Sequence, residues 1–222
     1  MQNLPDLTGP SRGPASQGPA KQLVVLLHGV GADGADLIEL APDLSRALPD
    51  ATFIAPDAPF PCDMAPYGRQ WFSLQDRSPA AMAAGVRHAA PILNQFLDRQ
   101  LAERGLSDED LVLVGFSQGA MMSLFTALRR PKAAAAVIAY SGALVDEETL
   151  GAEIASNPPI LLVHGDEDAV VEPGCLYHAA AILNRYNLSV TASMFSGLGH
   201  SIDGQAIEAA ISFLNDIFNK SS

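Results

Sequence analysis

The chain has 222 residues, of which 48% are hydrophobic and 17% are charged, and its formal net charge is −12. This composition excludes a generally disordered chain, and the length is sufficient to bury one sizeable core. The negative charge argues against electrostatic binding of nucleic acid or of an anionic lipid surface. We expect an N-terminal arm, residues 1–20, rich in proline and glycine, followed by a single domain over residues 21–222.

Nothing in the sequence predicts export, a membrane span or a metal site. The arm contains one cation, Arg12, and no continuous apolar segment, which is not how a secretory signal begins. Residues 133–145, the longest nearly continuous apolar stretch, are too few to cross a bilayer. Cys62 and Cys175 lie far apart without the spacing of a zinc site, so free thiols are expected. We therefore predict a soluble cytoplasmic protein without a cofactor.

Short apolar runs alternate with helical patterns from residue 23 onward. The runs lack polar alternation, as strands buried on both faces of a parallel sheet do, and they cover residues 23–27, 52–55, 111–114, 135–140, 160–163 and, more weakly, 190–195. Helices are predicted at 35–47, 79–104, 118–129, 173–187 and 205–219. Strands that alternate with helices predict an α/β fold whose mostly parallel central sheet is flanked by helices.

The helix 79–104 has the clearest boundaries. Ser78 is a suitable N-cap, Pro79 suits the first turn and Gly105 suits the stop. Pro91 should kink this helix unless the segment is two helices. The connection before it, residues 58–77, has no regular period, and loops of such length are often functional.

The sequence GFSQG at 115–119 places a serine between two glycines at the end of a predicted buried strand. A sharp turn from strand to helix there would lift the Ser117 hydroxyl above the sheet, and side chains at either glycine would collide with the turn. The same turn leaves the backbone N–H of Gln118 at a helix N-terminus, where it can bind negative charge. The pattern predicts a nucleophile elbow.

A serine hydroxyl needs a base to become reactive, and three histidines follow Ser117 in the chain. His178 falls in a helical pattern, where a solvated role is favoured, and His164 ends a strand, where a structural hydrogen bond is favoured. His200 lies in a glycine-rich loop after the last predicted strand. A loop in that place can bring an imidazole to the carboxyl edge of the sheet, so we predict His200 as the base.

The acid that orients this histidine should follow the strand 160–163, where Asp166, Glu167 and Asp168 stand together. Asp168 is favoured because the turn needs a few residues to carry a carboxylate over the sheet edge. Asp166 is the alternative, although it is better placed to brace the turn through a backbone hydrogen bond.

The loop HGVGADG at 28–34 follows the first predicted strand. Its glycines let the backbone approach a ligand, so the N–H of Val30 can join that of Gln118 in an oxyanion hole. His28 suits a bracing role. A phosphate-binding loop is excluded because the glycines match neither the Walker spacing nor GxGxxG.

The motifs LHGVGADG, GRQWFSL, GFSQGA, HGDEDAVV and GLGH occur in this order over most of the chain. Together they resemble the phospholipase/carboxylesterase family of α/β-hydrolases, which includes acyl-protein thioesterases and small bacterial carboxylesterases. The resemblance implies Ser117 as nucleophile, Asp168 as acid and His200 as base, with Val30 and Gln118 as oxyanion donors. It also implies a minimal lid, no metal or other cofactor, and the capacity to form a homodimer.

The resemblance implies hydrolysis of carboxylic esters, or of thioesters, with short- to medium-chain acyl groups. It places Met64, Trp71 and Phe72 beside the acyl chain, although a purely structural role for Trp71 stays open. Because the shared motifs belong to the chemistry and not to acyl recognition, lysophospholipase or acyl-protein thioesterase activity is an alternative. A non-catalytic ligand-binding protein on the same fold is the alternative of another class.

Overall fold

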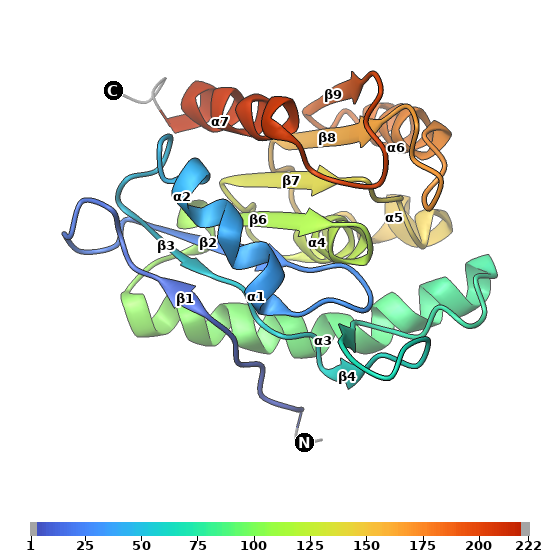
Figure 1. Cartoon of the computed structure of the whole chain (residues 1–222), viewed down its shortest axis with the longest axis horizontal. Coiled ribbons are helices and arrows are strands. Elements are labelled where there is room, and N and C mark those ends of the chain that lie inside the picture. Colours follow the sequence, from blue (N-terminus) through green and yellow to red (C-terminus); the bar gives the residue numbers. More distant parts are fainter. Residues whose placement is uncertain (1–3, 219–222) are drawn as a thin grey trace.

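The computed structural model describes residues 4–218, and its centre is a seven-stranded sheet in the order β1-β3-β2-β6-β7-β8-β9 (Figure 1). Neighbouring strands run parallel except β1, which pairs antiparallel with β3. The strands of this sheet are β1 Ser11–Arg12, β2 Gln22–Leu27, β3 Ala51–Ile54, β6 Leu111–Phe116, β7 Ala136–Tyr140, β8 Ile160–Gly165 and β9 Val190–Phe195. The fold is therefore the predicted α/β arrangement with a mostly parallel sheet.

Helices cover both faces of the sheet. They are α1 Gly34–Leu37, α2 Ala41–Leu44, α3 Pro79–Arg104, α4 Gln118–Arg129, α5 Glu147–Glu153, α6 Gly174–Arg185 and α7 Gly204–Phe218, with short 3₁₀ turns η1 Ile38–Leu40 and η2 Asp108–Asp110. Each connection between parallel strands returns the chain to the same end of the sheet, so the carboxyl ends of β2, β6, β7 and β8 meet at one edge.

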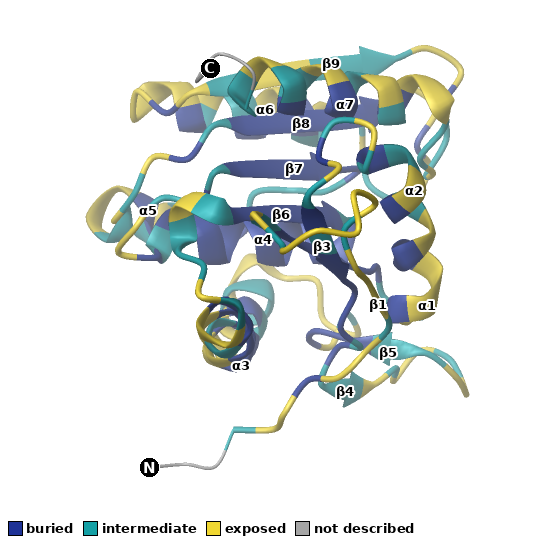
Figure 2. Cartoon of the chain, turned by 90° about the vertical axis from the view of Figure 1, so that its left-hand side faces the viewer, coloured by how far each residue is buried: buried dark blue, intermediate teal, exposed yellow. Residues whose placement is uncertain are grey.

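Alternate residues of the strands build two cores. In β6, Leu111 and Leu113 pack with α3, α4 and α6, whereas Val112 and Val114 pack with α1, α2 and α7. Figure 2 shows the central strands buried between these two helical layers. Burial on both faces explains why the strands read as continuous apolar runs.

The structure confirms the predicted helices with one exception. Residues 35–47 were expected to form one helix, and this was wrong, because the segment divides into α1, η1 and α2. Pro42 stands at the first turn of α2 and cannot donate to the preceding turn, which favours a break there. The short helix α5 was not predicted, because its seven residues are too few for a periodic pattern. The last predicted helix position, Asn219, lies outside the described residues.

The long helix α3 has the predicted boundaries. The Ser78 hydroxyl accepts from the N–H of Ala81 at 3.4 Å, and Gly105 ends the helix with φ 65°. Pro91 lies inside an uninterrupted helix, so the alternative of two helices is wrong. No helix within residues 4–218 combines the length and apolar character that a membrane crossing requires.

Two segments predicted to be irregular contain short strands. In the N-terminal arm, β1 adds an edge strand to the sheet and Leu7 is buried in the core. The long connection 58–77 folds into an antiparallel pair, β4 Phe60–Pro61 and β5 Arg69–Gln70. Pairs of two residues leave no alternation that a sequence pattern could reveal. The division into an arm and a domain at residue 20 stays a prediction.

Candidate active site

Ser117 lies in a strained turn between β6 and α4. Its backbone has φ 54° and ψ −115°, a conformation that non-glycine residues rarely adopt. A Cβ atom at Gly115 would lie 2.3 Å from the carbonyl oxygen of Gly119, and one at Gly119 would lie 1.8 Å from that of Leu27. Both glycines are therefore required by close backbone contact, as expected for a nucleophile elbow.

Asp168 and His200 form a hydrogen-bonded pair beyond the end of β8. Nδ1 of His200 lies 2.7 Å from Oδ2 of Asp168, whose side chain is completely buried. The other carboxylate oxygen accepts from the N–H groups of Val170 and Val171, both at 2.9 Å. The acid is thus held from two sides, and the bond to Nδ1 leaves Nε2 of His200 as the nitrogen for proton transfer.

Asp168 is ionised over the physiological pH range. Burial alone would raise the pKa of its carboxyl group, but the hydrogen bonds from His200 and from two backbone N–H groups outweigh burial and lower that pKa. A carboxylate in this state stabilises an imidazolium on its partner.

The His200 ring lies beside the elbow. Its centroid is 4.8 Å from that of Phe116, the residue before the serine, with the two rings inclined at 43°. Among the described residues, no hydrogen bond joins the Ser117 hydroxyl to His200. The contact through Phe116 therefore sets the position of the imidazole relative to the elbow, and catalytic hydrogen bonds often tighten only when substrate binds.

The loop after β2 approaches the same elbow. A Cβ atom at Gly29 would lie 3.3 Å from the Cβ of Ser117. The Val30 N–H makes no hydrogen bond within residues 4–218, and Gln118 is the first residue of α4, where the N–H has no partner inside the helix. Both donors predicted for an oxyanion hole thus belong to segments next to Ser117.

His28 braces this loop, in the role that the sequence predicted. Its Nε2 accepts from the N–H of Ala58 at 2.9 Å, and its Nδ1 donates to the carbonyl of Gly29 at 2.7 Å. Burial lowers the pKa of His28, so the ring is neutral and can accept and donate at once.

The side chain of Gln118 has a function that sequence reasoning missed. Its Oε1 accepts from the N–H of Trp71 at 2.8 Å, and its Nε2 donates to the carbonyl of Phe72 at 2.7 Å. The indole N–H of Trp71 donates to the carbonyl of His28 at 3.0 Å. These bonds tie the end of the long connection to the elbow and to the loop after β2. Gln at the position after a nucleophile gives no sequence signal for such a distant contact.

This placement bears on the residues predicted beside the acyl chain. Trp71 and Phe72 are 0% and 3% exposed and belong to the hydrophobic core. Burial favours the structural alternative for Trp71, and the acyl-pocket assignment stays a prediction. Met64 is 53% exposed and remains a candidate.

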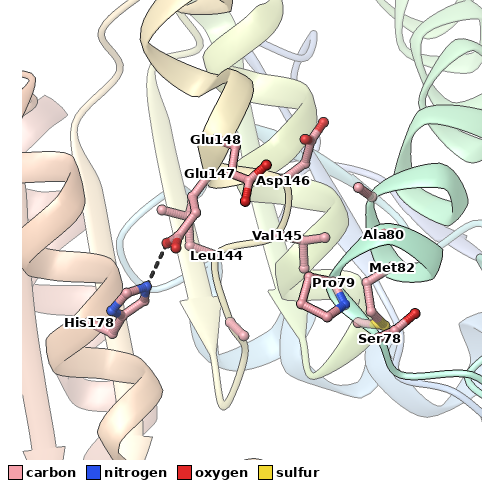
Figure 3. A pocket seen from close by; sticks show the side chains of 12 residues that line it. Ser78, Pro79, Ala80, Met82, Leu144, Val145, Asp146, Glu147, Glu148 and His178 are labelled. Atoms are coloured by element: carbon pink, nitrogen blue, oxygen red, sulfur yellow. Dashed lines mark hydrogen bonds and ion pairs between the residues drawn. The ribbon is translucent and has the colours of Figure 1, made fainter.

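A cavity of about 610 Å³ opens between the start of α3 and the start of α5 (Figure 3). One wall is the start of α3, and the other consists of the segment after β7, the start of α5, and α6. The lining residues are Ser78, Pro79, Ala80, Met82, Ala83, Ala143, Leu144, Val145, Asp146, Glu147, Glu148 and His178. A cavity of this size can hold a small ligand.

Gly142 lies between the elbow and the first cavity-lining residue of the segment after β7. A Cβ atom at Gly142 would lie 3.3 Å from the carbonyl oxygen of Ser117 and 2.5 Å from the Cβ of Ala120. Ala143, the next residue, lines the cavity. The cavity therefore begins within one residue of the contact with Ser117.

The remaining candidates have structural contacts. His178 is exposed on α6, and its Nε2 lies 2.5 Å from Oε2 of Glu147 across the cavity rim, as Figure 3 shows. Asp166 accepts from the N–H of Gly197 at 2.7 Å, so it holds the loop that carries His200 and does not contact that ring. Within residues 4–218, no three His, Cys, Asp or Glu side chains gather as metal ligands would.

The comparison with protein families decides the classification of this site. The family model described as phospholipase/carboxylesterase matches residues 14–218. The chain belongs to this family. Membership makes the protein a serine hydrolase of carboxylic esters or thioesters, and it implies small-molecule ester substrates.

The proteins that are similar to this chain include esterases and thioesterases. The chain is 31% identical to esterase YpfH of Escherichia coli over 200 residues, which are 88% of this chain and 83% of that one. It is 27% identical to acyl-protein thioesterase 1 of Kluyveromyces lactis over 216 residues, 89% of this chain and 92% of that one. The crystal structure of esterase PE8 superposes with a TM-score of 0.92 at 44% identity and covers 96% of this chain and 100% of that one.

Proposed function

We propose that Ser117, His200 and Asp168 carry the hydrolysis in two acyl-transfer steps. Nε2 of His200 takes the hydroxyl proton of Ser117 while the serine oxygen attacks the carbonyl carbon of the ester. Asp168 holds the imidazole through Nδ1 and stabilises the imidazolium that forms. The observation that carries this proposal is the 2.7 Å bond between Asp168 and His200 beside the strained Ser117 turn.

The oxyanion of the tetrahedral intermediate would be bound by backbone N–H groups. Val30 has an N–H without a partner in the described part of the chain, and Gln118 provides the N–H at the start of α4. The loss of one such donor typically lowers kcat by about 10²–10³-fold. His200 then protonates the leaving alcohol or thiol, and water repeats the sequence on the acyl-enzyme.

We propose that the acyl chain enters the cavity between α3 and α5. Its apolar lining, which includes Met82, Ala83 and Val145, suits a hydrocarbon chain, and the lining residue Ala143 follows Gly142, which lies close to the backbone of Ser117. A volume of about 610 Å³ accommodates short- to medium-chain acyl groups. Thioesters with the same acyl groups are second candidates, as the similarity to acyl-protein thioesterase 1 suggests.

We further propose that the substrates are dispersed in the cytoplasm and are not drawn from an anionic membrane surface. The formal net charge of −12 disfavours approach to such a surface.

Replacement of the nucleophile tests the proposal. The variant Ser117→Ala should lose turnover of a short p-nitrophenyl ester to the background rate, because the remaining groups cannot form an acyl-enzyme. Its circular dichroism and thermal unfolding should match those of the wild type, because alanine fits the same turn. Turnover retained by a folded Ser117→Ala variant would refute the assignment.

A further inference from the structure

A second histidine contacts the carboxylate of Asp168. His164 is the second-last residue of β8, the strand before the acid, and it is 1% exposed. Its Nε2 lies 3.2 Å from Oδ2 of Asp168 and 3.0 Å from the carbonyl oxygen of Val171. The carbonyl oxygen is an acceptor, so Nε2 of His164 carries the proton and donates to Val171, while the carboxylate oxygen of Asp168 lies in polar contact with the same N–H group.

With this contact, both oxygens of the carboxylate have polar neighbours on each side. Oδ1 accepts from the N–H groups of Val170 and Val171, and Oδ2 receives Nδ1 of His200 and Nε2 of His164. An ionised carboxylate has about four acceptor sites. Rotation of the Asp168 side chain would therefore break several of these bonds at once.

We propose that His164 is a positioning residue for the acid of the triad, and this proposal rests on the function proposed above. His164 touches neither substrate nor Ser117. It fixes the orientation of Oδ2, and it closes the turn 168–171 through the carbonyl of Val171. Without this donor, the carboxylate can rotate, and the orientation of His200 toward the serine is no longer fixed.

The pH dependence of the reaction distinguishes positioning from simple support of the fold. Loss of the His164 contact leaves more negative charge on the Asp168 carboxylate, which stabilises the imidazolium form of His200. Because the reaction needs the neutral imidazole, the acid limb of kcat/KM should move to higher pH. Besides the two histidines, the Cys175 thiol of α6 interacts with this carboxylate, and Glu172 lies in the electrostatic environment of the same thiol.

The test compares two substitutions of His164. Leucine removes the donor at similar volume, whereas glutamine keeps an amide N–H near the position of Nε2. We expect His164→Leu to lower kcat by about ten- to a hundredfold, the usual effect of losing a hydrogen bond to a charged group, with KM within about twofold. His164→Gln should recover most of the rate. The matched control is His88→Gln, an exposed histidine that stacks on Phe60 outside the site.

A double-mutant cycle distinguishes the positioning role of His164 from the proposed function of the triad. In an Asp168→Asn background, His164→Leu should cause little further loss, because its partner is already altered. A folded His164→Leu with the kcat and pH profile of the wild type would overturn the positioning role, while inactive Ser117→Ala would keep the proposed function intact. If leucine prevents folding, His164→Asn replaces it, since its shorter amide ends before the position of Nε2. Equal losses in the asparagine and glutamine variants would then overturn the proposal.

Discussion

The catalytic residues and the cavity lining differ in how strongly the backbone geometry restricts the residue type at each position. On the side of the chemistry, Gly115 and Gly119 admit no side chain, and three hydrogen bonds and the contact with His164 hold the carboxylate of Asp168. On the side of the cavity, the lining comes from α3, α5 and α6, and it includes exposed side chains such as that of Glu148. The chemistry is fixed by local geometry, whereas recognition depends on how distant helices are placed.

This difference explains why similar chemistry can serve different acyl groups. A side chain at either glycine of the elbow would place its Cβ atom less than 2.5 Å from a backbone oxygen, so few sequences can build the elbow. A change in the cavity wall alters only its volume or charge, so many sequences can line it. The family members that resemble this chain carry names of both esterases and thioesterases, in agreement with this view.

The largest expected effect on the recognition side comes from filling the cavity. Ala83 lines it from α3, and the variant Ala83→Trp would occupy the space of several methylene groups. We expect kcat/KM for an octanoyl ester to fall by about ten- to a hundredfold, while an acetyl ester is changed by less than about threefold. The measurement is a rate profile of p-nitrophenyl esters from two to twelve carbons.

The neighbouring residue offers the matched control for this profile. Ala84 is exposed on the same helix and does not line the cavity, so Ala84→Trp should keep the wild-type profile. Equal profiles for both tryptophan variants would place the acyl chain elsewhere.

A smaller effect is expected at Trp71, where an acyl contact and a structural role are the two alternatives. The variant Trp71→Phe removes the donor to the buried carbonyl of His28, and it should lower the free energy of unfolding by about 1–3 kcal/mol. The ratio of octanoyl to acetyl turnover should stay constant, because Trp71 lies in the core. Denaturant unfolding and the ester profile measure both quantities.

Substitution of Met64, the exposed acyl-pocket candidate, complements the test at Trp71. As it is 53% exposed, Met64→Ala should change the free energy of unfolding by less than about 0.5 kcal/mol. A changed chain-length profile in this variant would add Met64 to the acyl site, and a changed profile in Trp71→Phe would restore the role that the motif implied.

The smallest expected effect concerns the anchoring of α5, which forms part of the cavity wall. Glu153 bonds Arg129 of α4 and Arg87 of α3, both at 2.7 Å, and these bonds lower the pKa of Glu153 to about 2 from 4.5. A lowered pKa stabilises the fold above pH 4.5, and this contribution is lost as the pH falls toward 2. Glu153→Gln should therefore show a shallower loss of stability over that window.

Chemical unfolding at several pH values measures this slope. Glu148→Gln, an exposed position of the same helix, should keep the slope of the wild type. A Glu153→Gln variant with the wild-type slope would show that these ion pairs add nothing to the stability of the wall.

The parts of the molecule that sequence reasoning predicted are those set by local rules. Continuous apolar runs predicted the sheet, and Ser78 and Gly105 marked the ends of α3. The pairing of Asp168 with His200 followed from the order of the motifs on the fold. Contacts between segments distant in the chain carry no local signal, so the bonds of Gln118 to the loop at 71–72 were missed. For the same reason the sequence could not show that Trp71 is buried in the core.

The most direct test of the account is covalent labelling. It measures which residue is labelled and whether the labelling rate depends on His200. After reaction with a fluorophosphonate, peptide mapping by mass spectrometry should find the label on Ser117. A folded His200→Gln variant should be labelled at least about a hundredfold more slowly, because the hydroxyl then lacks its base. A label on another residue, or equal labelling rates for His200→Gln and the wild type, would contradict the account.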